Sequence, residues 1–120
     1  MWLIYNTKSD SAHHIEDNEF LLTKKCARPH GHTYQIRIKL DMEFLQKHYD
    51  REFVDFALIS KDIDKIIDEY DHHNITDKFG IHTVENLQSH LKTQIINSYG
   101  IPEHKIILTI METAKFGVEE

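Results

Sequence analysis

The chain has 120 residues, 40% of them hydrophobic and 28% charged, which is the composition of an ordinary globular protein with one domain over residues 1–120. Its formal net charge of -6 argues against general nucleic-acid binding, because contacts with phosphates need a basic surface. No apolar run approaches the length of a membrane span, the start lacks the basic region of a signal peptide, and a lone cysteine forms no internal disulfide, so we expect a cytoplasmic protein.

The first part of the chain predicts two strands. Residues 1–6 have the pattern of a strand, which residues 8–15 continue as a polar segment that a bulge could interrupt. Residues 16–25 have the character of a connecting loop. From Tyr34 to Leu40 apolar and polar residues alternate without a break, so a second strand is predicted from about His32 to Asp41. Residues 42–52 are mixed in character and predict no definite element.

Two helices are predicted in the middle of the chain. Asp55 or Ser60 is the candidate N-cap of the first, whose apolar face consists of Ile59, Ile63, Ile66, Ile67 and Tyr70. A polar turn is predicted over residues 71–79. Thr83 is the N-cap expected for the second helix, which ends near Gly100.

Two more strands are predicted near the carboxyl end, over residues 105–112 and, more briefly, over residues 114–118. The order strand, strand, helix, helix, strand, strand predicts an α+β fold in which a four-stranded antiparallel sheet carries both helices on one face. Four strands leave two open edges, and pairing between subunits would cover them.

The stretch that suggests chemistry lies at the start of the second strand. If the extended conformation reaches back through Gly31, then His30 and His32 share one face of the strand, which suits two ligands of one metal ion. The only cysteine, Cys26, lies four residues before His30. Three simpler readings compete with this one: a solvated turn, a buried apolar thiol and a tract that binds metal adventitiously.

Six short motifs resemble, in order and spacing, those of the 6-pyruvoyl-tetrahydropterin synthase family. They are Ser11-Ala12-His13, Cys26-x-x-x-His30-Gly31-His32, Val54-Asp55-Phe56, Asp71-His72-His73, Thr83-x-Glu85-Asn86 and Glu112-Thr113. The short gap between Cys26 and His30 resembles the bacterial and archaeal branch, the 6-carboxy-5,6,7,8-tetrahydropterin synthases called QueD. The family has the tunnelling fold, whose order of two strands, two helices and two strands matches the order predicted above.

The resemblance implies a zinc ion bound by His13, His30 and His32. Three neutral imidazoles leave a fourth coordination position open, as catalytic zinc sites do. The alternatives are that His14 replaces His13 as a ligand, or that both are surface residues.

The resemblance also implies that Cys26 is the general base and that Asp71 and His72 complete a proton relay. A free thiol is mostly protonated at neutral pH, so it needs a nearby histidine or metal to become a thiolate. Read by themselves, Asp71 and His72 would be a polar turn after a helix.

Three further residues resemble the family's contacts with the pterin ring. Glu112 would hold the guanidine-like edge of the ring through two hydrogen bonds, with Thr83 and Glu85 beside it. As a helix cap with an acidic first turn, Thr83 and Glu85 also have a structural explanation, and both roles can hold at once.

The activity implied is the conversion of 7,8-dihydroneopterin triphosphate to 6-carboxytetrahydropterin, acetaldehyde and triphosphate, in a homohexamer built from two trimers with sites at subunit interfaces. One alternative is 6-pyruvoyl-tetrahydropterin synthesis or another pterin-converting lyase activity. Another, of a different class, is a non-catalytic protein that binds zinc or pterin. Ser9 and His82 stand where the family usually has phenylalanine and proline, which bears on substrate preference more than on the metal ligands.

Overall fold

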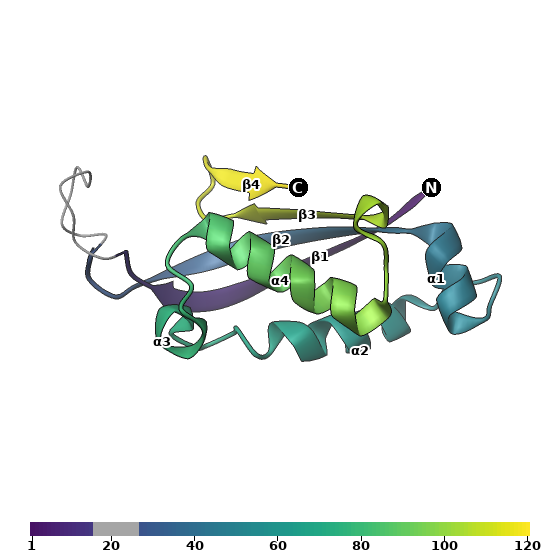
Figure 1. Ribbon diagram of the computed structural model, residues 1–120, viewed down its shortest axis with the longest axis horizontal. Coiled ribbons are helices and arrows are strands. Elements are labelled where there is room, and N and C mark those ends of the chain that lie inside the picture. Colours follow the sequence, from purple (N-terminus) through teal and green to yellow (C-terminus); the bar gives the residue numbers. More distant parts are fainter. Residues whose placement is uncertain (16–26) are drawn as a thin grey trace.

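The computed structural model describes residues 1–15 and 27–120. Within them a four-stranded sheet has the order β1-β2-β3-β4, with every neighbouring pair antiparallel. The strands are β1 (Trp2–His13), β2 (His30–Asp41), β3 (Ile106–Met111) and β4 (Gly117–Glu119). Figure 1 shows α2 and α4 together on one face of this sheet. The predicted α+β class and tunnelling-fold architecture are thereby confirmed.

The first two strands form one long, regular ribbon. Their register is unbroken from Trp2 opposite Asp41 to His13 opposite His30, so the predicted interruption of the first strand by a bulge is wrong. The second strand begins at His30 and passes through Gly31, two residues earlier than its predicted start. Because side chains alternate along a strand, His30 and His32 point to the same face of the sheet.

Both predicted helices are present with the expected caps, but the first ends at Ile67, so the placement of Tyr70 on its apolar face is wrong. In α2 (Phe56–Ile67) the Asp55 side chain accepts a hydrogen bond from the Ala57 N–H, which decides between the two candidate caps. In α4 (Val84–Tyr99) Thr83 accepts from the Asn86 N–H, and Gly100 ends the helix in the left-handed conformation.

Two short helices were not predicted. Helix α1 (Met42–Tyr49) is capped by Asp41 and buries only Leu45 completely, so its apolar pattern is too sparse to identify. The turn expected over residues 71–79 contains α3 (Ile75–Phe79), whose cap is Asn74. Five residues are too few to display a helical period. A single 3-10 turn, η2 (Glu103–Lys105), precedes β3.

The hydrophobic core lies between the sheet and helices α2 and α4. Alternate residues of the strands are buried in it, together with the apolar residues of the two helices. Its fully buried side chains include Ile38, Leu40, Ile59, Ile63, Leu87, Leu91, Ile95, Leu108 and Ile110. Burial of these apolar side chains stabilises the sheet, including the end of the sheet where β1 finishes and β2 begins.

A partly buried polar pair joins α4 to the turn that follows α2. The Tyr70 hydroxyl lies 2.7 Å from Nδ1 of His90, and burial lowers the pKa of the His90 imidazole. The folded protein therefore binds this proton less readily than the unfolded chain, whose histidines titrate near about 6.5. Stability from this group is present above that pH and is lost as the pH falls through the folded pKa.

Replacing His90 with asparagine should weaken the fall in stability on acidification. Asparagine keeps an acceptor for Tyr70 but takes up no proton, so the free energy of unfolding should decrease less between pH 7 and pH 5 than in the unmodified protein. Urea unfolding of metal-free protein at pH 7, 6 and 5 measures this. The control is His104→Asn, which removes an exposed imidazole. An unchanged pH dependence in the His90 variant would contradict the expectation.

The face of the sheet away from the helices carries exposed apolar side chains, Trp2 and Ile4, on β1. The outer edge of β1 is partly covered, because the amide of Ala12 donates to the His73 carbonyl and the amide of His72 donates to the Asp10 carbonyl. In the described ranges, none of the helices has the length and apolar character needed to cross a bilayer.

Candidate metal and pterin site

Three imidazoles meet at the end of the sheet where β1 finishes and β2 begins. His13 lies directly opposite His30 in the strand register, and His32 is two residues farther along the same face. The ring centroids are 4.5 Å apart for His13 and His30, and 5.0 Å apart for each of the other two pairs. One ring nitrogen from each lies within 4.8 Å of the other two. The three residues assigned to zinc by resemblance are thus brought together.

Backbone carbonyls fix which nitrogen of two rings is free. Nδ1 of His13 lies 2.7 Å from the carbonyl oxygen of His82, and Nδ1 of His30 lies 2.7 Å from that of Arg28. A carbonyl only accepts, so each Nδ1 carries the hydrogen and each neutral ring keeps a lone pair on Nε2. Carbonyl partners of this kind orient metal-binding histidines in known sites.

His82 and the end of β1 hold each other in place. While the His82 carbonyl accepts from His13, Nδ1 of the His82 ring lies 3.0 Å from the carbonyl of His14 and donates to it. The His14 ring packs against His82 instead of joining the three imidazoles, and the His14 amide donates to Thr76. Of the two adjacent histidines, His13 is therefore the one that lies beside His30 and His32.

His13 is the most buried of the three, with 2% of the residue exposed. Burial lowers the pKa of its imidazole, which favours the neutral ring that a metal requires. Its Nε2 has no hydrogen-bond partner in the part of the chain that the structure describes. A buried nitrogen that lacks a partner, beside two more imidazoles, fits a site that binds a cation.

Tyr34 forms the floor beneath the imidazoles. It follows His30 and His32 on the same face of β2, and its ring centroid lies 6.2 Å from that of His13 and 5.6 Å from that of His32. The residue is completely buried, and burial raises the pKa of its phenol. Its hydroxyl also lacks a partner among residues 1–15 and 27–120. The site is therefore closed toward the core.

The carboxylate of Glu112 faces the same imidazoles. Glu112 directly follows β3, the neighbour of β2, and its Oε1 lies 3.4 Å from Nε2 of His13 and 3.7 Å from Nε2 of His32. About a quarter of its side chain, 25%, is exposed. The residue assigned by resemblance to the pterin ring is thus next to the candidate metal ligands.

The donor set suits a transition metal. Imidazole nitrogens bind zinc, copper, iron or nickel, and three of them with an open fourth position are typical of catalytic zinc. Neutral rings, carbonyl-fixed tautomers and a buried nitrogen without a partner all agree with that chemistry. The residues present therefore fit the metal that the resemblance implies.

Asp71 and His72 form a separate cluster at the outer edge of β1. Asp71 accepts a hydrogen bond of 2.8 Å from the Asp10 amide, and Nε2 of His72 lies 3.5 Å from Oδ2 of Asp71. His72 has a positive φ of 58°, and 79% of its side chain is exposed. Within the described residues, no hydrogen bond or ion pair joins this cluster to the three imidazoles. The two residues of the predicted relay are thus neighbours, but within one chain they make no such contact with the candidate metal ligands.

Three predicted residues remain: Thr83, Glu85 and Cys26. Thr83 follows His82 in sequence, so the start of α4 lies against the imidazole cluster, and Glu85 is exposed in the first turn of that helix. Cys26 lies outside the described residues.

Sequence reasoning missed four contributors to these clusters. The carbonyls of Arg28 and His82 orient two rings, but a backbone group leaves no mark on residue type, so no sequence signal points to them. Asp10 joins Asp71 and His72 through the strand edge. Tyr34 had a signal, because it continues the period of two set by His30 and His32.

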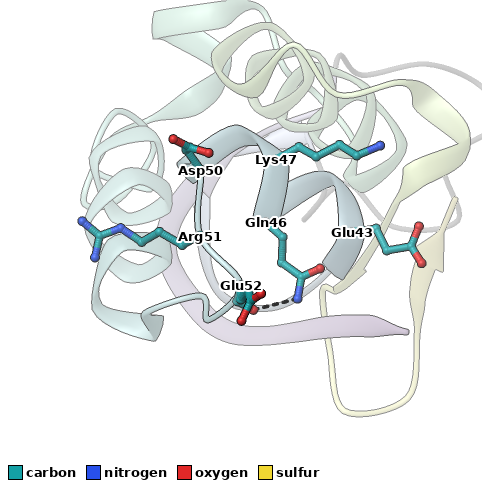
Figure 2. Close-up of a pocket in the computed structure, with 6 residues that line it drawn as sticks. All are labelled: Glu43, Gln46, Lys47, Asp50, Arg51 and Glu52. Carbon is teal, nitrogen blue, oxygen red and sulfur yellow. Dashed lines mark hydrogen bonds between the residues drawn. The ribbon is translucent and has the colours of Figure 1, made fainter.

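A surface depression at the other end of the sheet does not compete with this site. Figure 2 shows it on α1 and the turn after that helix. Helix α1 follows Asp41, at the opposite end of β2 from His30. It is lined by Glu43, Gln46, Lys47, Asp50, Arg51 and Glu52. Lys47 and Arg51 point away from each other, and the hydrogen bond drawn runs 2.8 Å from Gln46 to the Glu52 carbonyl. Nothing there converges on a common ligand.

Two comparisons with known proteins cover nearly the whole chain. The model of the family described as 6-pyruvoyl tetrahydropterin synthase matches residues 4–119. A curated relative, dihydroneopterin monophosphate aldolase of Pyrococcus furiosus, is 26% identical over 117 residues, which cover 98% of this chain and 94% of that protein.

Solved structures show the same fold. The 6-pyruvoyl tetrahydropterin synthase of Caenorhabditis elegans matches with a TM-score of 0.74 and 20% identity, covering 100% of this chain and 94% of that one. The synthase of Plasmodium falciparum matches with a TM-score of 0.71 and 15% identity, covering 100% and 96%.

Proposed function

Because the chain belongs to the 6-pyruvoyl tetrahydropterin synthase family, whose model matches residues 4–119, we propose that it is a zinc-dependent 6-carboxy-5,6,7,8-tetrahydropterin synthase. Its substrate is 7,8-dihydroneopterin triphosphate, and with water it yields 6-carboxytetrahydropterin, acetaldehyde and triphosphate. The observation that carries the proposal is the convergence of His13, His30 and His32 beside the Glu112 carboxylate. An imidazole site for a metal next to an acceptor for the pterin ring is what this reaction needs.

The three imidazoles would hold the zinc ion, His13 and His30 through the Nε2 atoms that their carbonyl partners leave free. A bound zinc ion supplies Lewis acidity, which lowers the pKa of hydroxyl groups on the substrate side chain. The carbonyls of Arg28 and His82 keep two of the rings in the required tautomer. Glu112 accepts two hydrogen bonds from the guanidine-like edge of the pterin, and this fixes the orientation of the side chain.

Protons move through Cys26 and the Asp71 and His72 pair. Cys26 as thiolate takes a proton from a side-chain carbon, and His72, oriented by Asp71, exchanges the proton on a side-chain oxygen. Since Asp71 and His72 lie apart from the imidazoles of their own chain, we propose that a homo-oligomer brings them to the site of a neighbouring subunit. A hexamer of two trimers is the assembly that the resemblance implies.

The second candidate is an aldolase that acts on a dihydroneopterin phosphate. The Pyrococcus furiosus relative, 26% identical over 98% of this chain, favours it. An aldolase breaks one carbon–carbon bond of the side chain and leaves the phosphate on the released aldehyde. A synthase releases the phosphate chain itself, so the two activities give different products from the same scaffold.

One assay separates these reactions. The zinc-loaded protein is incubated anaerobically with 7,8-dihydroneopterin triphosphate and, in parallel, with the monophosphate. Acetaldehyde with 6-carboxytetrahydropterin is the expected result. Triphosphate with a 6-pyruvoyl product would indicate the pyruvoyl activity, and a phosphorylated aldehyde would indicate the aldolase. A protein that holds zinc and turns over neither substrate would be a binding protein, and the proposal would be wrong.

Replacing Cys26 with alanine should lower turnover of the triphosphate by about 100-fold to 10,000-fold, the range typical of general-base catalysis. Zinc content should stay at the level of the unmodified protein, because the thiol is not one of the proposed ligands. Initial rates and metal content of the same preparation measure both effects. Cys26→Ser is the matched variant, since its hydroxyl keeps the size but is a far weaker base. Unchanged turnover in both would remove Cys26 from the mechanism.

A further inference from the structure

The position of Glu112 suggests a second use of its carboxylate. We propose that Glu112 is a fourth, displaceable ligand of the metal, which it binds while no pterin is present. The inference rests on the proposed function, because it requires a metal ion on His13, His30 and His32. It adds to that function a closed resting state of the site.

The distances have the size expected of a tetrahedral metal site. With metal–nitrogen and metal–oxygen bonds of about 2.0–2.2 Å, neighbouring ligand atoms of a tetrahedron are about 3.3–3.6 Å apart. Oε1 of Glu112 lies 3.4 Å from Nε2 of His13 and 3.7 Å from Nε2 of His32. These are close to two edges of such a tetrahedron, and they are too long for hydrogen bonds of ordinary strength.

The atoms that face each other need a cation between them. Nδ1 of His13 carries the ring hydrogen, so the Nε2 nearest Glu112 presents a lone pair. A carboxylate oxygen is also an acceptor, and two acceptors 3.4 Å apart repel each other unless a positive ion is shared. In the described ranges, the ion pairs of the Glu112 carboxylate are those with His13 and His32, and neither Lys nor Arg forms one with it.

The backbone around Glu112 holds the carboxylate in this place. The amides of Glu112 and Thr113 both donate to the carbonyl of Phe116, at 3.0 and 3.2 Å, and so close the turn between β3 and β4. Glu112 therefore leaves the sheet directly beside β2, on the side of the imidazoles. A partly exposed side chain on such a turn can swing toward an arriving ligand while its backbone stays fixed.

A pterin would compete with the metal for the same oxygen atoms. The carboxylate pairs with the guanidine-like edge of the ring through both of its oxygens, and it cannot bind the metal in that pose. Pterin binding would thus pull Glu112 away and open the fourth position for a substrate oxygen. Glu112 would therefore occupy the fourth position of the metal only until substrate arrives.

The test measures coordination directly and needs no turnover. Co²⁺ replaces zinc, and its visible absorption is recorded for the unmodified protein and for the Glu112→Gln, Glu112→Ala and Glu103→Gln variants. Glu103 is an exposed carboxylate on the turn before β3, 3.8 Å from Nζ of the buried Lys92 and without an ion pair to the imidazoles, which makes it the control. Zinc affinity is measured by competition with a chelator, and the circular dichroism of the metal-free proteins establishes that each variant folds.

The expected result is a changed Co²⁺ spectrum and zinc binding at least about 10-fold weaker in both Glu112 variants, with no change for Glu103→Gln. Adding unsubstituted pterin should shift the unmodified spectrum toward that of Glu112→Ala and leave the variant spectrum in place. Equal spectra and equal affinities for all the proteins would overturn this inference alone. An unmodified protein that binds no metal would overturn both this inference and the proposed function. If the unmodified protein catalyses the reaction and the Co²⁺ spectrum of Glu112→Ala equals its own, this inference is wrong and the proposed function stands.

Discussion

Replacing His32 with alanine should abolish stoichiometric zinc binding and lower turnover of 7,8-dihydroneopterin triphosphate by at least about 1,000-fold, or about 4 kcal/mol in the activation free energy. His32 is one of three imidazoles whose ring nitrogens lie within 4.8 Å of one another. Loss of a direct ligand should exceed the 10- to 100-fold effect on affinity that is typical of groups behind the ligands. Metal analysis after dialysis and initial rates at saturating zinc provide the two readouts.

Two other histidines make the result specific. His104→Ala removes an exposed imidazole distant in sequence from the site, and it should keep both zinc and activity. His14→Ala tests the neighbouring residue, whose ring packs on His82, and it should retain stoichiometric zinc. If zinc were lost with His14 and kept with His32, the assignment of ligands would be wrong.

Replacing Leu91 with alanine should destabilise the protein by about 3–4 kcal/mol, because it removes a completely buried side chain and leaves a cavity between α4 and the sheet. For a chain of this size the midpoint of thermal unfolding should fall by roughly 10–15 °C. Urea or thermal unfolding of chelator-treated protein gives the free energy without a contribution from bound metal. Protein concentration must be equal throughout, since an oligomer gains stability with concentration.

The control on the same helix is Gln94→Ala, an exposed residue one turn away. Alanine and glutamine have similar helix propensities, so this variant should change the free energy of unfolding by about 0.5 kcal/mol or less. Equal destabilisation by the two variants would mean that α4 does not pack as described.

The fold was predictable because its longest elements have strong periodic patterns. The alternation from Tyr34 to Leu40 and the helical spacing of Ile59, Ile63 and Ile67 come directly from burial on one face. Thr83 and Gly100 marked the ends of α4 through cap chemistry. Helices α1 and α3 were missed since they are short and contribute few buried residues, so their positions depend on packing that no local pattern records.

The candidate site was only partly predictable. Strand periodicity placed His30 and His32 on one face, and the register of the ribbon then set His13 opposite His30, which no local pattern indicates. His13 and not His14 lies beside the other imidazoles because successive side chains of a strand point to opposite faces, and His13 is the one opposite His30. The separation of Asp71 and His72 from the imidazoles was not foreseen, because it follows from how a turn lies along a strand edge.

The exchange of hydrogen bonds between His82 and the end of β1 couples two parts of the chain that are far apart in sequence. One carbonyl orients the ring of a proposed ligand, and the ring of the same residue returns a hydrogen bond to the next carbonyl of the strand. Proline, which is usual at this position in the family, has no side-chain donor and cannot make the second of these bonds. In this protein two hydrogen bonds therefore hold the start of α4 to the end of β1, and a metal ion bound by His13 would further stabilise the folded form that contains this contact.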